Sequence, residues 1–214
     1  MRKKTVILII SLVFTGFLSS AQVDNSKSKP TLDQAGEPLA SFQDVSIQFT
    51  HNMDNNEHDI HEEKSGSAFI KDDMYRINIQ DQIIISDGET VWSFLPESKE
   101  VQVASAEENA ENNPLKVLSN WEEKYRSKYI RTETIAGKTI DIIDLVPKEG
   151  KSFFKVRVRI NQKNHQLVSS TVYDKTSTTY TYIIEEFKTN NDLPDSKFRF
   201  NKSNHPDVEV IDLR

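Results

Sequence analysis

Three histidines close together are the residues of this chain with the most obvious chemical potential. His51, His58 and His61 stand in an acidic stretch, and histidines at short spacing can ligate a metal ion. The surrounding segment, residues 52–65, is dominated by polar and charged side chains and has no apolar periodicity that would fix a ligand geometry. The pattern favours a long solvated connection between two strands, and we predict no metal site.

Adjacent carboxylates occur at residues 72–73, 107–108 and 185–186. Neighbouring residues on a strand point to opposite faces, so such pairs cannot easily share a proton or a substrate. His165 and His205 stand alone, and no nucleophile elbow, P-loop, dinucleotide fingerprint or zinc-protease motif occurs. We therefore predict no catalytic residue, no cofactor and no enzyme, and a hydrolase of apolar substrates is the disfavoured alternative.

The first residues are typical of a secretory signal peptide. A basic start at residues 2–4 precedes an apolar run, residues 6–18, and small residues at 19–21. The run is shorter than the roughly 20 apolar residues of a membrane span, which argues against an anchor. The chain has no cysteine, which excludes disulfides and lipid attachment to an N-terminal cysteine. Cleavage after Ala21 would give a soluble periplasmic protein.

Length and charge limit the partners. Removing 21 of 214 residues leaves 193, and it changes the formal net charge from −6 to −9 because three basic residues are lost. An acidic chain is poorly suited to neutralising phosphates, so we predict no nucleic-acid partner. We expect a polar, flexible leader over residues 22–30 and one domain over residues 31–214.

The period of the apolar residues changes to two at Asp44, where Val45, Ile47 and Phe49 alternate with polar residues. Similar patterns predict antiparallel strands over residues 68–71, 75–79, 82–86, 91–95, 101–103, 129–134, 138–147, 153–161, 167–174, 179–187 and 197–200. About ten strands are more than a flat open sheet usually holds, so we predict a curled sheet. The strand at 153–161 has one apolar face and one basic face.

The sequence Asp87-Gly88 predicts a two-residue type I′ turn. Such a turn would pair Ile85 with Thr90 and Ile83 with Trp92. Ile83, Ile85 and Trp92 would then share one strongly apolar face.

Two amphipathic helices could cover the mouth of this sheet. In the first, Thr31 caps an apolar stripe of Leu32, Ala35, Leu39 and Phe42, and Pro38 should kink or shorten the helix. The second begins at Asn113-Pro114, carries Leu115, Leu118, Trp121 and Tyr125, and ends near Lys128. These residues could be ordinary core, or they could enclose a cavity for apolar ligands.

The order and spacing of several segments resemble the outer-membrane lipoprotein carrier family of the LolA type. They are Ile85-Ser86-Asp87-Gly88 with Val91-Trp92 and Pro96, Ser152-Phe153-Phe154-Lys155-Val156, Leu193-Pro194-Asp195, Phe198-Arg199-Phe200, and the closing Val208-Glu209-Val210-Ile211-Asp212. The resemblance covers the mature chain from Leu32. It implies a mainly β, α+β fold: an unclosed antiparallel β barrel with a helical lid.

That resemblance also implies a function. Members bind the acyl chains of lipoproteins in an apolar cavity, collect them from an inner-membrane ABC-type release complex, and carry them to an outer-membrane acceptor. We expect a monomeric carrier of this kind. A lipid-binding or envelope-stress sensor module on the same fold is the alternative, because fold does not fix function.

We expect the cavity to be lined by strand residues and covered by the second helix. The cavity residues are Ile47, Phe49, Ile77, Ile83, Ile85, Trp92, Phe94, Phe154, Val156, Val158 and Tyr182, and the lid residues are Leu115, Leu118 and Trp121. The best-known carriers have an arginine followed by proline that hydrogen-bonds the lid closed. Asp72 and Asp73 stand there in this chain, and Lys71 or Arg76 could substitute for that arginine.

Overall fold

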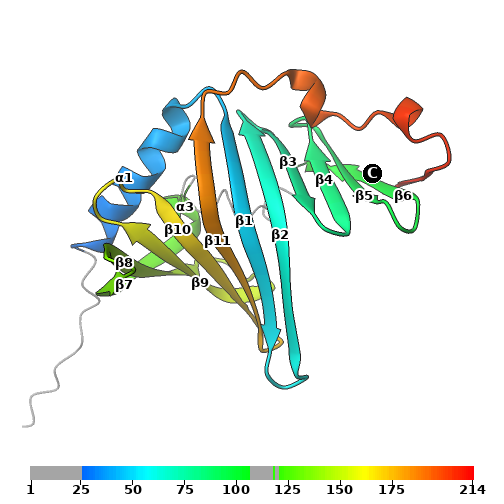
Figure 1. Ribbon diagram of the computed structural model, residues 1–214. Coiled ribbons are helices and arrows are strands. Elements are labelled where there is room, and N and C mark those ends of the chain that lie inside the picture. Colours follow the sequence, from blue (N-terminus) through cyan, green and yellow to red (C-terminus); the bar gives the residue numbers. More distant parts are fainter. Residues whose placement is uncertain (1–25, 107–117, 119–120) are drawn as a thin grey trace, which may run out of the picture.

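The computed structural model describes residues 26–106, 118 and 121–214 (Figure 1). These residues form one 12-stranded sheet in the order β12-β6-β5-β4-β3-β2-β1-β11-β10-β9-β8-β7. The strands are β1 (Val45–Asn55), β2 (Ile60–Lys71), β3 (Met74–Ile79), β4 (Gln82–Ser86), β5 (Thr90–Leu95), β6 (Glu100–Ser105), β7 (Tyr125–Ile135), β8 (Lys138–Pro147), β9 (Phe153–Asn161), β10 (Leu167–Asp174), β11 (Thr178–Thr189) and β12 (Glu209–Asp212). The helices are α1 (Ser28–Ser41) and α3 (Trp121–Lys124), with 3₁₀ turns η3 (Asp195–Phe198) and η4 (Lys202–Asn204).

The sheet consists of two meanders joined through one pair of strands. β1 to β6 follow one another by hairpins, as do β7 to β11, and β1 pairs antiparallel with β11 along its whole length. β12 adds to β6 in parallel, the single parallel pair among the described strands. β7 and β12 end the sheet without pairing to each other. The prediction of an unclosed, antiparallel-dominated sheet with few helices is confirmed.

The two faces of the sheet pack against different parts of the chain. Cross-strand partners share a face, so the register places Ile47, Ala68, Ile77 and Ile84 together on what we call the inner face. The same face continues through Val158, opposite Ser170 and Ile143, at the other end of the sheet. Two hydrophobic clusters lie on the inner face, one of them shared with helix α1.

The opposite, outer face of β4 to β6 is covered by the C-terminal segment. Phe94, Val101 and Val208 form a third cluster there, with Ile83, Trp92 and Phe200 packed against it. In Figure 1 this segment runs from β11 past β3 and β4 to the far end of the sheet. Residues 197–200 were predicted to be a strand, but Lys197 and Phe198 instead end the 3₁₀ turn η3 and the next two residues belong to no strand. Phe198 is fully buried.

The β4–β5 hairpin has a longer loop than the two-residue turn predicted at Asp87-Gly88. Ile85 pairs with Trp92 and Ile83 with Phe94, so the predicted pairing was wrong by two residues. The Asp87 carboxylate accepts hydrogen bonds from the backbone amides of Glu89 and Thr90, at 3.1 and 2.9 Å. This Asx-type turn closes the loop in place of a type I′ turn. A shift of two residues keeps the same side chains on the same face.

The polar segment 52–65 is not a solvated connection. It forms the far ends of β1 and β2, with only a four-residue turn between Asn55 and Ile60. The prediction failed because Met53 and Ile60 are the only apolar residues of this segment, so the alternation that marks a strand is missing. Within this hairpin, His61 Nδ1 lies 2.8 Å from Oδ1 of Asp54, its cross-strand partner.

The helices also differ from the sequence-based expectation. α1 begins at Ser28, within the segment expected to be a flexible leader, and continues through Pro38 to Ser41. Thr31 is not its cap, because its hydroxyl donates to the Lys27 carbonyl one turn earlier (3.0 Å). α3 ends at Lys124 and β7 begins at the next residue, Tyr125. The predicted helix end near Lys128 was therefore wrong by about one turn. Its beginning, with Leu115, lies outside the described residues.

A close approach at Gly66 generates a stability prediction. A Cβ atom there would lie 2.5 Å from Phe49 Cζ and 2.9 Å from the Asn78 carbonyl oxygen, whereas a Cβ atom at Gly150 meets nothing within 4 Å. Gly66→Ala should lower the free energy of unfolding by about 1–3 kcal/mol because it overpacks the inner face. Gly150→Ala should leave it within about 0.5 kcal/mol. Urea unfolding measures both, and equal effects would contradict this packing.

Candidate ligand pocket

A pocket of about 910 Å³ lies between the inner face of the sheet and the helices. This volume is near the upper end of the range for small-molecule sites, which is about 300–1,000 Å³. Its floor comes from β1, β2, β3 and β11, and its roof from α1, Leu118 and α3. The apolar lining residues are Leu32, Ala35, Phe42, Val45, Ile47, Ile70, Tyr75, Ala106, Leu118, Trp121, Leu167, Ile184 and Phe187.

The polar residues that line the pocket are mainly acidic. Among the described lining residues, seven carboxylates accompany two lysines: Asp33, Glu37, Asp44, Asp72, Asp73, Glu122 and Glu123, with Lys71 and Lys124. Asp44 is nearly fully buried and accepts hydrogen bonds from the amides of Asn191 and Leu193, at 2.8 and 3.0 Å. Burial alone would raise the pKa of Asp44, but these hydrogen bonds lower it below its ordinary value. The pocket thus combines an apolar lining with a net negative charge.

The roof is held by apolar packing and a few polar contacts between helices. Leu32 and Ala35 of α1 are buried with Leu118 and Trp121. The Trp121 indole donates to Asp33 at 3.2 Å, and Lys29 pairs with Glu122 at 2.6 Å. α1 and α3 therefore form one unit over the pocket.

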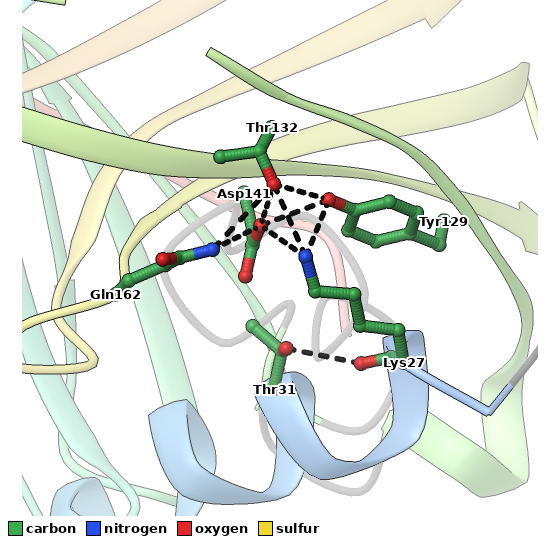
Figure 2. Close-up of polar contacts among 6 residues, drawn as sticks. All are labelled: Lys27, Thr31, Tyr129, Thr132, Asp141 and Gln162. Atoms are coloured by element: carbon green, nitrogen blue, oxygen red, sulfur yellow. Dashed lines mark hydrogen bonds and ion pairs between the residues drawn. The ribbon is translucent and has the colours of Figure 1, made fainter. Parts of the chain in front are cut away.

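A polar cluster anchors the start of α1 to the sheet (Figure 2). The Lys27 ammonium donates to Tyr129 Oη at 2.8 Å and contacts Asp141 Oδ1 at 3.4 Å. Asp141 also accepts from Thr132 at 2.8 Å and from Gln162 at 2.8 Å. Burial would raise the pKa of Asp141, but the hydrogen bonds from Thr132, Gln162 and Tyr129 and the charge of Lys27 together lower it.

Neither of the cations considered as a lid latch forms a hydrogen bond or ion pair with α1 or α3, the two α-helices among the described residues. Lys71 binds the Leu193 carbonyl at 3.0 Å and Asp195 at 2.7 Å. Arg76 donates to Asn78 at 3.0 Å and to the Lys197 carbonyl at 3.4 Å. Both side chains thus hold the C-terminal segment, and Lys27 is the cation that ties α1 to the sheet.

The sequence-based site residues divide between the two faces. On the inner face lie Ile47, Phe49, Ile77, Val156, Val158 and Tyr182. Of these strand residues Ile47 lines the pocket, together with the lid residues Leu118 and Trp121. Phe49 and Ile77 are packed within the cluster on the floor side, and Val156 and Val158 within the cluster under α1.

The placement of the other five was wrong. Ile83, Ile85, Trp92 and Phe94 alternate with the inner-face residues of β4 and β5 and lie on the outer face. Phe154 is 51% exposed, and its ring packs beside the outer-face Tyr173. A register shift between Tyr173 and Asp174 breaks the alternation that had grouped Phe154 with Val156.

Several lining residues were missed. Val45, Ile70, Ile184 and Phe187 reach the pocket because β1 pairs with both β2 and β11, and Phe42 reaches it from the residue that follows α1. The apolar character of all five was visible in the sequence. The first four lie on predicted strands, whereas Phe42 was predicted to lie on the first helix. The pairing of β1 with β11, more than a hundred residues away, had no local signal.

His51 lies at the far end of the inner face among aromatic side chains. Its ring centroid is 4.8 Å from that of Tyr182 and 6.2 Å from that of Tyr180. Burial, with a smaller effect of the Lys64 charge, lowers the pKa of His51 below its ordinary value near 6.5. Burial also raises the pKa of Tyr182 to about 12. Among the described residues no group of three potential metal ligands comes together.

An open antiparallel sheet with an apolar pocket beneath its helices defines this chain as a member of the open-barrel class of β proteins. No helix in the described part of the chain is long and apolar enough to cross a membrane. The family model for the outer membrane lipoprotein carrier protein LolA matches residues 40–201. The chain belongs to the LolA family.

Curated relatives carry the same family name at low identity, and a solved structure shares the fold. The outer-membrane lipoprotein carrier protein of Psychromonas ingrahamii is 26% identical to this chain, and the match covers 59% of this chain and 62% of that protein. The protein of the same name from Legionella pneumophila is 23% identical, and the match covers 94% of this chain and 96% of that protein. The match to the Psychromonas protein thus spans less than two thirds of it. An uncharacterized conserved protein from Thermus thermophilus has the same fold, with a TM-score of 0.59, 10% identity, and coverage of 86% of this chain and 98% of that chain.

The Asp141 cluster predicts how α1 responds to substitution. Asp141→Ala should cost about 1–3 kcal/mol of unfolding free energy because it removes the acceptor shared by several donors. Lys27→Met should cost less than about 1 kcal/mol because the Lys27 side chain is 48% exposed. Urea unfolding and amide exchange across α1 measure both, with the exposed Asp207→Ala as control. Unchanged α1 protection in Asp141→Ala would contradict the anchor.

The half-buried His51 predicts a pH dependence. Its folded-state pKa lies below that of the unfolded chain, so the unfolded state binds more protons as the pH falls through about 6.5. Acidification from about pH 7.5 to about pH 5.5 should therefore destabilise the wild type more than His51→Gln. His58→Gln, on the exposed turn of the same hairpin, should behave as the wild type. Parallel pH curves for the wild type and His51→Gln would refute the assignment.

Proposed function

We propose that the protein is an exported, periplasmic carrier that binds the acyl chains of lipoproteins in the pocket under α1. Membership of the LolA family and the helix-covered apolar pocket support this proposal together. The mature chain would begin at Gln22 and act as a monomer. It would collect acylated lipoproteins from an inner-membrane ABC-type release complex and deliver them to an outer-membrane acceptor.

The energetics of the task match a pocket of this kind. Transfer of an acyl chain out of water gains about 0.8 kcal/mol per methylene, so about ten methylenes correspond to about 8 kcal/mol. Val45, Ile47, Ile184 and Phe187 offer apolar area on the floor, and the α1–α3 unit supplies the roof. No bond is made or broken in this transfer, so the carrier requires no catalytic group.

A release assay tests the proposal directly. Purified mature protein would be incubated with spheroplasts that have intact export machinery and are synthesising lipoproteins. We expect newly made lipoproteins to leave the inner membrane in a soluble complex with the protein. Failure to release them, when a functional carrier does so in the same preparation, would overturn the carrier function.

Neighbouring isoleucines on β11 provide a matched pair of variants. Ile184 lines the pocket, whereas Ile183 is 39% exposed on the outer face. Ile184→Glu should weaken binding of a fluorescent fatty acid at least tenfold, because the new carboxylate would either be buried without a partner or displace the acyl chain from the pocket. Ile183→Glu should bind like the wild type. Circular dichroism would check that both variants fold, and equal affinities of two folded variants would place the acyl site elsewhere.

A further inference from the structure

The outer face of the β7–β9 end of the sheet is strongly basic, although the chain as a whole is acidic. The registers place seven cations on it: Arg126, Lys128, Arg131, Lys138, Lys155, Arg157 and Arg159. The outer face of these three strands carries two carboxylates, Glu133 and Asp144. With the chain at a net charge of −6, this concentration of positive charge marks a separate surface.

The two carboxylates neutralise only part of this charge. Asp144 is buried and binds Arg157 through two hydrogen bonds of 2.6 and 2.9 Å, with Lys155 at 3.4 Å. Glu133 pairs with Arg131. No carboxylate of the described residues forms an ion pair with Arg126, Lys128 or Arg159, and the first two are exposed. These three cations are therefore available to an external partner.

Large apolar side chains are exposed on the same face. Ile135, Val146 and Phe154 are 42%, 40% and 51% exposed, and each belongs to one of the three basic strands. Phe154 packs beside Tyr173, whose ring lies 4.1 Å from the Lys155 ammonium. Exposed aromatic and aliphatic side chains among lysines and arginines are typical of surfaces that rest in the interfacial region of a membrane.

The charge of the pocket is opposite to that of this face. Carboxylates dominate the polar lining of the pocket on the inner side, so an anionic surface would attract one side of the molecule and repel the other. We propose that the outer face of β7–β9 docks on an anionic phospholipid surface and leaves the pocket turned away from the lipid. Exposed apolar side chains on all three basic strands, Ile135, Val146 and Phe154, match insertion into the interfacial region of a membrane, and on this ground we choose a lipid surface over an acidic protein. The docking requires no acyl chain in the pocket, so it stands independently of the proposed function.

Vesicle co-sedimentation of the mature protein tests the docking. We expect binding to vesicles of phosphatidylcholine mixed with phosphatidylglycerol, weak binding to phosphatidylcholine alone, and loss of binding as salt is raised. Combining Arg126→Gln, Lys128→Gln and Arg159→Gln should weaken binding at least tenfold, since each cation near the surface contributes about fivefold. Phe154→Ser should weaken it further.

Matched variants separate this face from general charge and from the pocket. Combining Lys99→Gln, Lys163→Gln and Lys175→Gln changes the net charge equally at exposed turns and should leave binding intact. Ile184→Glu should also bind vesicles like the wild type, which distinguishes docking from uptake of lipid in the pocket. Absence of binding to the anionic vesicles, or equal loss in both triple variants, would overturn the proposal. Binding of poly-glutamate without binding of vesicles would overturn it in favour of an acidic protein.

Discussion

The pairing of β1 with β11 is the interaction on which the rest of the structure depends. It runs from Val45 opposite Thr189 to Asn55 opposite Thr178 and joins two meanders that are otherwise separate hairpin series. It places Ile47 beside Phe187, so pocket-lining residues from both meanders meet at this seam, and it pairs the core residue Phe49 with the pocket-lining Ile184. Because the seam links residues far apart in sequence, its loop-closure entropy must be offset by the packing on the inner face.

The two sides of the sheet are stabilised by different means. On the inner side, α1 packs through Leu32 and Ala35 and is anchored at its start by Lys27 and the Asp141 cluster. On the outer side, the C-terminal segment is tied by Lys71 and Arg76 and buries Phe198. The helix that roofs the pocket therefore depends on contacts separate from those that fix the C-terminal segment.

The sequence predicts the bounds of the strands far better than it predicts what covers each face of the sheet. Strands at 82–86, 138–147, 153–161 and 167–174 have the predicted bounds, because alternating apolar residues lie between clear turn signals. The period of two groups Ile83, Ile85 and Trp92 correctly on one face. It carries no information on whether a helix or the C-terminal segment covers that face, which is why these residues were assigned to the cavity. The hairpin at 52–65 was missed because its sequence is almost entirely polar and shows no apolar alternation.

The unpaired ends of the sheet have a mechanical consequence. A closed barrel has a circumference fixed by its number of strands and its shear, so its interior cannot grow without breaking hydrogen bonds. Here β7 and β12 do not meet, and no such ring constrains the sheet. Small changes of twist, distributed over the strand pairs, can alter the radius of curvature while every ladder remains intact. The curvature of the sheet can therefore adjust to the volume of a molecule that packs against its inner face.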